Sequence, residues 1–482
     1  MREIDRPNLL FFFPDQHRHD WLGSNTELPL RTPNIDRLAA RGVRFTNAVC
    51  PSPLCSPSRA CLATGNEYHS SDVLGNADTL STSVTTYFQR LRDEAGYHVM
   101  GCGKFDLHKG SYSWGVDGQT SLEKWGFSDG IDNAGKLDGI TSADWTKHPS
   151  RIGVGIEECW NTAYEAVISD STQPSEPYTA YLQEQGLLVE HAEDYNTRWE
   201  LDGNAAFPTT LPEEAYIDNW IGRQGLSLLE EAPDDSPWYL VVNFAGPHSP
   251  FDVTEEMHDW YRNPDVEFPN PTSSGVDSVT DDEEVRRNYA AMIENIDRWV
   301  GQYLDVLANR GELENTIVVY SSDHGEMLGD HGIWGKSVPF QPSVGVPLII
   351  AGPDVEDRDP YDAPMTILDL HDTFLDYAGV KNRSTSSSRS IRHLLEDPNS
   401  EHRDYVVSGL GDWRMIFDGR YKYIDGWTPD NNGETTNIQD GVLFDLVEDS
   451  QETENIANKR PEVTHELRTR IDDSDSNSNI RC

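Results

Sequence analysis

The sequence predicts an α/β fold in which a large mixed, mostly parallel sheet is covered by helices on both faces. Short continuous apolar runs alternate with long helical patterns, and several of the runs end in polar residues. Residues 8–13 are apolar and stop at Pro14-Asp15-Gln16, which is typical of a buried strand. In such sheets the active groups gather beyond the carboxyl ends of the strands.

The elements follow in chain order. Thr32-Pro33 opens a helix that Gly42 is expected to close, because Pro favours the first turn and Gly the position after the last. Long helices are predicted where apolar residues repeat at helical spacing, and buried strands where short apolar runs recur. The predicted helices are 214–231 and 282–310, and the predicted strands are 239–244, 317–321 and 347–351.

Two regions depart from this rhythm. Residues 109–211 show few periodicities and are interpreted as insertions over the active face that choose the substrate. Beyond a polar linker at 384–390, short alternating segments predict a small antiparallel sheet with a closing helix at 463–471 and a frayed end at 472–482. We therefore expect a catalytic domain at 1–381 and a smaller C-terminal α+β domain at 382–482. The four strands of that sheet are predicted at 405–408, 414–417, 421–424 and 443–446.

The chain is strongly acidic. It carries 83 Asp and Glu against 38 Lys and Arg, a net charge of −45. Such a surface repels nucleic acid and anionic membrane, so neither is an expected partner. The diffuse acid excess predicts a halophilic protein, since concentrated salt screens self-repulsion. Disorder is excluded because aromatic residues and apolar runs recur throughout the chain.

Six cysteines show no regular spacing, which favours reduced thiols over disulfides or a zinc site. The first apolar run is too short for a signal peptide, and no segment reaches membrane-spanning length. A soluble, cytoplasmic protein is expected. The cysteines are Cys50, Cys55, Cys61, Cys102, Cys159 and Cys482.

Carboxylate, amide and imidazole groups follow two predicted strands. Asp15 and Gln16 follow the first, and Asp323 and His324 follow the strand at 317–321. Oxygen ligands with one imidazole suit a hard divalent cation, with Ca²⁺ preferred and Mg²⁺ or Mn²⁺ as alternatives. Taken singly, such residues more often cap helices or begin turns.

The segment Cys55-Ser56-Pro57-Ser58-Arg59, continued by Leu62-Ala63-Thr64-Gly65, resembles the signature of the type I sulfatases. That family belongs to the alkaline phosphatase superfamily, so the resemblance implies an alkaline phosphatase-like fold. It also implies that a formylglycine-generating enzyme oxidises Cys55 to formylglycine. The hydrated aldehyde would attack sulfur, and its second hydroxyl would then be deprotonated to expel sulfate. An unmodified buried cysteine is the ordinary alternative.

Other motifs in the same order carry the resemblance further. They imply that Asp15, Asp323 and His324 bind the metal. The resemblance also implies that the remaining motif residues contact the nucleophile or the sulfate ester, with His248 protonating the leaving oxygen. Those residues are Arg59, Lys104 in Gly103-Lys104, His248 in Pro247-His248-Ser249-Pro250, and Lys336 in Trp334-Gly335-Lys336.

The chain departs from the family pattern at two places. Gln16 stands where two consecutive aspartates are usual, so the expected metal site has one negative charge fewer. Phe105-Asp106-Leu107-His108 follows Lys104 in place of Trp-His, which leaves His108 either a displaced substrate ligand or a surface residue. Phosphonate monoester hydrolases also have Asp-Gln, and their pocket asparagine is weakly matched by Asn76.

Three functions remain open at this point. The first is metal-dependent hydrolysis of a small-molecule or saccharide sulfate ester, with formylglycine at position 55. The second is phosphonate monoester or phosphate diester hydrolysis with the same nucleophile. The third is a non-catalytic binder of a sulfated or phosphorylated ligand. The sequence does not indicate the oligomeric state.

Overall fold

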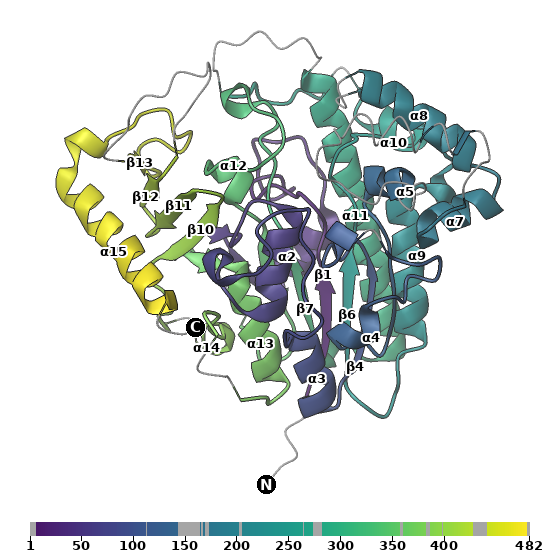
Figure 1. The fold of residues 1–482 in the computed structure, drawn as a ribbon, viewed down its shortest axis with the longest axis horizontal. Coiled ribbons are helices and arrows are strands. Elements are labelled where there is room, and N and C mark those ends of the chain that lie inside the picture. Colours follow the sequence, from purple (N-terminus) through teal and green to yellow (C-terminus); the bar gives the residue numbers. More distant parts are fainter. Residues whose placement is uncertain are drawn as a thin grey trace.

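The computed structural model describes residues 6–111, 113–142, 164, 167–168, 173–201, 205–263, 265–272, 282–356, 360–381, 386–397, 399–427 and 441–479. At its centre lies a seven-stranded sheet in the order β2-β8-β7-β1-β6-β4-β5 (Figure 1). Neighbouring strands are parallel, except that β8 runs antiparallel to β7 and β2. These strands are β1 (Asn8–Phe12), β2 (Gly42–Phe45), β4 (His98–Gly103), β5 (Asp129–Asp132), β6 (Trp238–Asn243), β7 (Thr316–Ser321) and β8 (Leu348–Ala351).

Helices cover both faces of this sheet (Figure 1), so the predicted fold class is confirmed. A two-stranded parallel pair, β3 (Ala48–Val49) and β9 (Met365–Thr366), lies beside it. The α-helices are α1 (Pro33–Ala39), α2 (Cys55–Thr64), α3 (Tyr87–Ala95), α4 (Leu122–Trp125), α5 (Lys136–Ser142), α7 (Pro177–Glu184), α8 (Leu188–Glu200), α9 (Ile217–Glu230), α10 (Glu255–Trp260), α11 (Asp282–Arg310), α12 (Gln341–Val344), α13 (Leu370–Tyr377), α14 (Arg392–Glu396) and α15 (Pro461–Asn479).

Strand β1 shows why its sequence is continuously apolar. Phe11 faces one side of the sheet, where its ring lies 5.4 Å from that of Phe374 in α13. Phe12 faces the other side, 5.3 Å from the ring of Tyr303 in α11. Both faces are therefore covered, and a strand buried on both faces has no polar alternation.

The C-terminal part forms a separate four-stranded antiparallel sheet in the order β10-β11-β12-β13, at the left of Figure 1. Leu467 and Ile471 of α15 pack against this sheet, which confirms the predicted sheet and closing helix. The boundary predicted between residues 381 and 382 stays a prediction, and residues 382–385 lie outside the described residues. The strands are β10 (Val406–Leu410), β11 (Trp413–Phe417), β12 (Tyr421–Asp425) and β13 (Val442–Asp445).

Two expectations about local structure were wrong. Gly42 does not close α1, which ends at Ala39; it begins β2, where a Cβ would lie 2.1 Å from the carbonyl oxygen of Ile350. Residues 472–479 are not frayed, because α15 continues to Asn479 once its apolar face is anchored; residues 480–482 lie outside the described residues. The described part of the region 109–211 contains the helices α4, α5, α7 and α8 and the strand β5, and its interpretation as insertions stays a prediction.

The described cysteines, Cys50, Cys55, Cys61 and Cys102, are buried free thiols, as predicted. Cys159 and Cys482 lie outside the described residues. Among the helices that the structure describes, none has the length and apolar character needed to cross a bilayer.

Candidate active site

The carboxyl ends of two neighbouring parallel strands bring the predicted metal ligands together. Asp15 follows β1, and Asp323 and His324 follow β7. One donor atom from each of these residues and from Cys55 lies within 4.8 Å of all the others, and all four residues are buried. The residues predicted from the sequence therefore form one compact cluster at the carboxyl ends of two central strands of the main sheet.

Gln16 lies at the rim of this cluster. Its backbone N–H donates to Asp323 Oδ1 at 3.0 Å, and its side-chain oxygen accepts a hydrogen bond from Lys336. The backbone has a φ of 73°, in the left-handed region that few residues other than glycine adopt. Gln16 thus contacts both a predicted metal ligand, Asp323, and Lys336, which lies beside Cys55.

Cys55 is the first residue of α2, and its sulfur faces the cluster. The distances from Sγ are 3.2 Å to His324 Nε2 and 3.3 Å to Lys336 Nζ. Asn76 accepts a hydrogen bond from the backbone N–H of Ser56 at 3.1 Å, so it satisfies one of the free donors of the first turn of α2. The structure therefore places Asn76 directly beside the predicted nucleophile.

The charges around Cys55 favour its thiolate. Burial and the Asp15 carboxylate oppose ionisation, but Lys104, Lys336 and His324 outweigh them, so the pKa of Cys55 lies well below its usual range. A helix N-terminus acts in the same direction. By contrast, burial raises the pKa of Cys61, on the same helix, well above its usual value. The two thiols differ because only Cys55 faces the cationic side chains.

Arg59 and Lys104 bind the carboxylates of Asp323 and Asp15. Arg59 Nε donates to Asp323 Oδ2 at 2.8 Å, and its Nη1 donates to the carbonyl oxygen of Lys104 at 2.7 Å. Lys104 Nζ contacts Asp15 and lies 2.9 Å from Asp106 Oδ2. Burial opposes the charge of Asp15, but Lys104, His248 and Lys336 hold its pKa well below the usual range. Asp15 is therefore ionised at neutral pH.

His248 lies on the loop after β6, which runs beside Asp15. The backbone of Asp15 pairs with Pro247, and its N–H bonds to the carbonyl oxygen of Gly246 at 3.1 Å. His248 Nδ1 is 2.5 Å from the carbonyl oxygen of Ser249. This contact assigns the proton to Nδ1 and leaves Nε2 as the free ring nitrogen.

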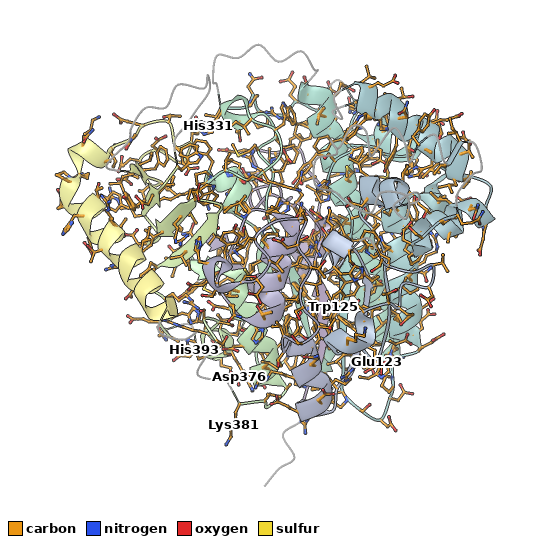
Figure 2. The ribbon with its side chains drawn as sticks, viewed as in Figure 1. Glu123, Trp125, His331, Asp376, Lys381 and His393 are labelled. Atoms are coloured by element: carbon orange, nitrogen blue, oxygen red, sulfur yellow. The ribbon has the colours of Figure 1, made fainter. Side chains whose placement is uncertain are left out.

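His108 is not among the residues that the structure brings together. It is buried, its ring stacks on that of Trp125 at 5.1 Å, and its Nε2 lies 3.4 Å from Asp132 Oδ2. Trp125 is labelled in Figure 2. Burial lowers the pKa of His108 to about 4. The prediction of a surface residue is wrong, and the role of His108 in substrate binding stays a prediction.

Two functional neighbours were missed by sequence reasoning. Glu326 accepts a hydrogen bond from the Gln16 side-chain amide. Asn243, the last residue of β6, accepts one from Arg59 Nη1 at 3.0 Å. Glu326 stands two residues after His324, and Asn243 ends a buried strand. Both are polar residues at the carboxyl ends of strands, and this position is the signal that could have identified them.

The donor set fits a divalent cation. Asp15 and Asp323 supply carboxylate oxygens, Gln16 an amide oxygen and His324 an imidazole nitrogen, all in a buried position. His324 Nδ1 is 3.0 Å from the carbonyl oxygen of Gly325. This contact directs Nε2 toward the cluster, the usual arrangement for a metal-binding histidine.

Comparison with known proteins identifies the class. Residues 7–380 match the family model described as Sulfatase, and the chain belongs to the sulfatase family. It is 26% identical to the arylsulfatase of Clostridium perfringens, covering 97% of this chain and 92% of that protein. It is also 26% identical to the choline-sulfatase of Rhizobium meliloti, covering 94% and 82%. The protein is a sulfuric ester hydrolase.

Solved structures agree on the fold. The phosphonate monoester hydrolase of Agrobacterium radiobacter superimposes with a TM-score of 0.73 at 21% identity, covering 98% of this chain and 96% of that one. A protein solved with its substrate D-glucosamine-2-N,6-O-disulfate superimposes with a TM-score of 0.72 at 19% identity, covering 98% of both chains. The alkaline phosphatase-like architecture is thus confirmed.

Proposed function

We propose that the protein hydrolyses sulfate esters with a formylglycine nucleophile formed from Cys55. The position of Cys55 at the start of α2, 3.2 Å from His324 and inside the cluster with Asp15 and Asp323, carries this proposal. A thiolate would give a sulfur adduct with no easy exit, whereas a hydrated aldehyde can release sulfate and regenerate itself. Attack forms a bond from its oxygen to sulfur and breaks the sulfur–oxygen bond of the ester.

Each basic residue has a proposed role that follows from its place. Lys104 and Lys336 both act electrostatically on Cys55 and would bind the sulfate oxygens. His248 would donate a proton to the leaving oxygen. Arg59 would hold the nucleophile and Asp323 in place. Asn76, beside Cys55, and His108, which is more remote, are proposed to contact the substrate.

The cluster of Asp15, Gln16, Asp323 and His324 is proposed to hold one divalent ion. When bound, that ion would lower the pKa of the nucleophilic hydroxyl and withdraw charge from the ester. Ca²⁺ is the first choice because three of the four residues offer oxygen, and Mg²⁺ or Mn²⁺ are the alternatives.

Maturation must precede folding. Cys55, Ser56, Ser58 and Arg59 are between 0% and 3% exposed, and Pro57 is buried as well. A formylglycine-generating enzyme could not reach this segment in the folded chain. The partner enzyme is therefore proposed to act on the unfolded polypeptide.

Peptide mass spectrometry and one pair of variants test the nucleophile. An aldehyde or its hydrate at position 55 is expected in protein from the native host. Cys55→Ala should lower turnover of an aryl sulfate by roughly a thousandfold or more, as for other nucleophile deletions. Cys61→Ala, a buried cysteine on the same helix, is the matched control and should keep most activity. An active Cys55→Ala enzyme would refute the proposal.

A second activity is favoured by two features of the site. Gln16 takes part in it and Asn76 lies beside Cys55, the two features that resemble phosphonate monoester hydrolases. Turnover of an aryl sulfate should be compared with that of an aryl phosphonate monoester and a phosphate diester. A preference for either phosphorus ester would replace the first assignment. The non-catalytic alternative is set aside because the chain is a sulfuric ester hydrolase.

The substrate is proposed to be a small-molecule or saccharide sulfate ester, since the relatives include choline-sulfatase and N-acetylglucosamine-6-O-sulfatase. Work in concentrated salt and a cytoplasmic location also stay predictions. The first rests on the net charge of −45 and the second on the reduced cysteines. A melting temperature that rises with added KCl would support the salt prediction.

A further inference from the structure

A buried carboxylate outside the predicted ligand set contacts Gln16. Glu326 is fully buried, and its Oε1 accepts the backbone N–H groups of Leu328 at 3.1 Å and Gly335 at 2.6 Å. Its Oε2 accepts a hydrogen bond from Gln16 Nε2. The first two contacts hold the carboxylate in place, so it presents a fixed acceptor to the Gln16 amide.

The opposite end of the same amide meets a donor. Lys336 Nζ donates to Gln16 Oε1. If the amide were flipped, its NH₂ group would face an ammonium and its carbonyl oxygen would face a carboxylate, and both hydrogen bonds would become repulsive contacts. Glu326 and Lys336 together therefore permit one orientation of the amide, with the oxygen toward Lys336, whose Nζ also lies 3.3 Å from Cys55 Sγ.

The backbone of Gln16 is restrained as well. Its N–H donates to Asp323 Oδ1 at 3.0 Å, and its carbonyl oxygen accepts from the Tyr289 hydroxyl at 2.6 Å. These contacts fix the backbone from which the side chain extends, while Glu326 and Lys336 hold the amide at its other end.

We propose that Glu326 is a positioning residue that aims the Gln16 oxygen at the metal site. Its carboxylate, which contacts the Gln16 amide, also stands in for the carboxylate that position 16 lacks. A carboxylate at position 16 would lie in contact with Glu326, and two buried carboxylates in contact repel each other. Glutamine at 16 and glutamate at 326 thus form one complementary pair. This inference rests on the proposed metal site.

Metal affinity of a reciprocal pair of variants tests it. Ca²⁺ is titrated by calorimetry into metal-free full-length protein, with Mn²⁺ as a second probe, all at one salt concentration. Asp15→Asn serves as the blank, because the acidic surface will bind Ca²⁺ weakly at other places. Glu326→Gln should weaken the strong site about 10- to 100-fold, the usual effect of losing an outer partner of a ligand.

A double variant that exchanges the amide and the carboxylate distinguishes a positioning role of Glu326 from a general loss of metal affinity. Gln16→Glu alone should lower the melting temperature of the metal-free protein, because two carboxylates are then in contact. Combining Gln16→Glu with Glu326→Gln restores one carboxylate facing one amide. The double variant should regain Ca²⁺ affinity to within about tenfold of the original, instead of showing the product of the two losses.

The control and the contrary results are distinct. Asp297 also accepts two backbone N–H groups, those of Asn34 and Ile35, but far from the cluster. Asp297→Asn should lower the melting temperature and leave Ca²⁺ affinity unchanged. The same pattern in Glu326→Gln would reduce Glu326 to a loop-stabilising residue and overturn the inference. Absence of a strong site in the unaltered protein would overturn the metal proposal and this inference together.

Discussion

Two regions on opposite sides of the main sheet support the two loops that carry His248 and Lys336. In Figure 1 the insertion helices α5, α7 and α8 lie to the right of the sheet, and the C-terminal sheet with α15 lies to the left. In the insertion, Lys136 Nζ donates to Asp252 Oδ1 at 2.6 Å and to the carbonyl oxygen of Pro250 at 3.0 Å. Pro250 stands two residues after His248.

In the C-terminal sheet, too, a buried lysine contacts a carboxylate and a backbone carbonyl oxygen. Lys422 Nζ, on β12, lies 2.5 Å from Glu452 Oε1 and donates to the carbonyl oxygen of Pro339 at 3.0 Å. Pro339 stands three residues after Lys336. Phe340, the next residue, stacks at 4.0 Å on His331, which is labelled at the upper end of Figure 2. Each region therefore holds one of these two loops through a buried lysine.

The surroundings of the two pairs differ. Burial opposes the charge of Asp252, yet Lys136 and Arg198 lower its pKa below the usual value, and Tyr195 donates to it at 3.0 Å. For Lys422, burial outweighs Glu452 and its pKa is lowered. The insertion thus stabilises its charges in a network, whereas the C-terminal pair pays much of the desolvation cost alone.

The largest expected effect comes from removing one partner of the networked pair. Lys136→Met leaves the Asp252 carboxylate buried beside fewer positive groups and should lower the free energy of unfolding by about 3–5 kcal/mol. Urea denaturation in constant salt measures it. As a surface control, Arg470→Ala breaks the pair with Glu466 on α15 and should cost less than about 0.5 kcal/mol. Equal losses would contradict the role assigned to burial.

Removing both partners should separate the two regions. Lys422→Met combined with Glu452→Gln leaves no buried charge and keeps an oxygen for the Gln341 N–H. It should recover about 2 kcal/mol of the loss caused by Lys422→Met alone. The corresponding Lys136→Met and Asp252→Asn pair should recover less, because Arg198 also loses its neighbouring charge. Equal recovery in the two regions would remove the distinction between network and isolated pair.

The insertion contains a pH-sensitive residue beside its network. Burial lowers the pKa of His191 to about 4, below the unfolded value of about 6.5. Between these values the unfolded chain binds more protons than the folded one, so stability falls as the pH is lowered. From pH 7.5 to pH 5 this residue should account for about 2 kcal/mol. Between pH 7.5 and pH 5, the free energy of unfolding of His191→Phe should fall by about 2 kcal/mol less than that of the unaltered protein. A variant with the same pH profile as the unaltered protein would contradict the prediction.

The smallest effects concern catalysis. Lys136→Arg keeps the charge but shifts the His248 loop, since a guanidinium does not fit a lysine site. Loss of proton donation should slow alkyl sulfates about tenfold while changing 4-nitrophenyl sulfate, whose leaving group needs no proton, by less than about twofold. Lys422→Arg should slow both substrates alike, because Lys336 contacts Cys55 itself. The ratio of the two rates distinguishes the loops.

Much of the fold could be predicted from the sequence. The strands at 8–13 and 317–321 and the helix at 282–310 were placed to within a residue or two, since burial on both faces leaves an unbroken apolar run. The weaker strands β2, β4 and β5 escaped because glycine and polar residues interrupt their patterns. Their pairing depends on neighbours that only the folded sheet supplies.

The candidate site divides in the same way. Asp15, Cys55, Asp323 and His324 were predicted because strand ends and the α2 signature are local features of the chain. Glu326 was missed because its contact with Gln16 joins residues 310 positions apart.

By itself, the sequence predicted the fold class, the most apolar strands, the long helices and the candidate residues of the site, because these depend on short segments. Only the tertiary structure decided that the His108 ring contacts those of Trp114 and Trp125. It alone also decided that two buried lysines support the loops that carry His248 and Lys336. It also decided that a glutamate stands behind Gln16. Such contacts depend on how distant segments pack, and a hydrogen-bonding side chain carries no mark of its partner until packing brings the two together.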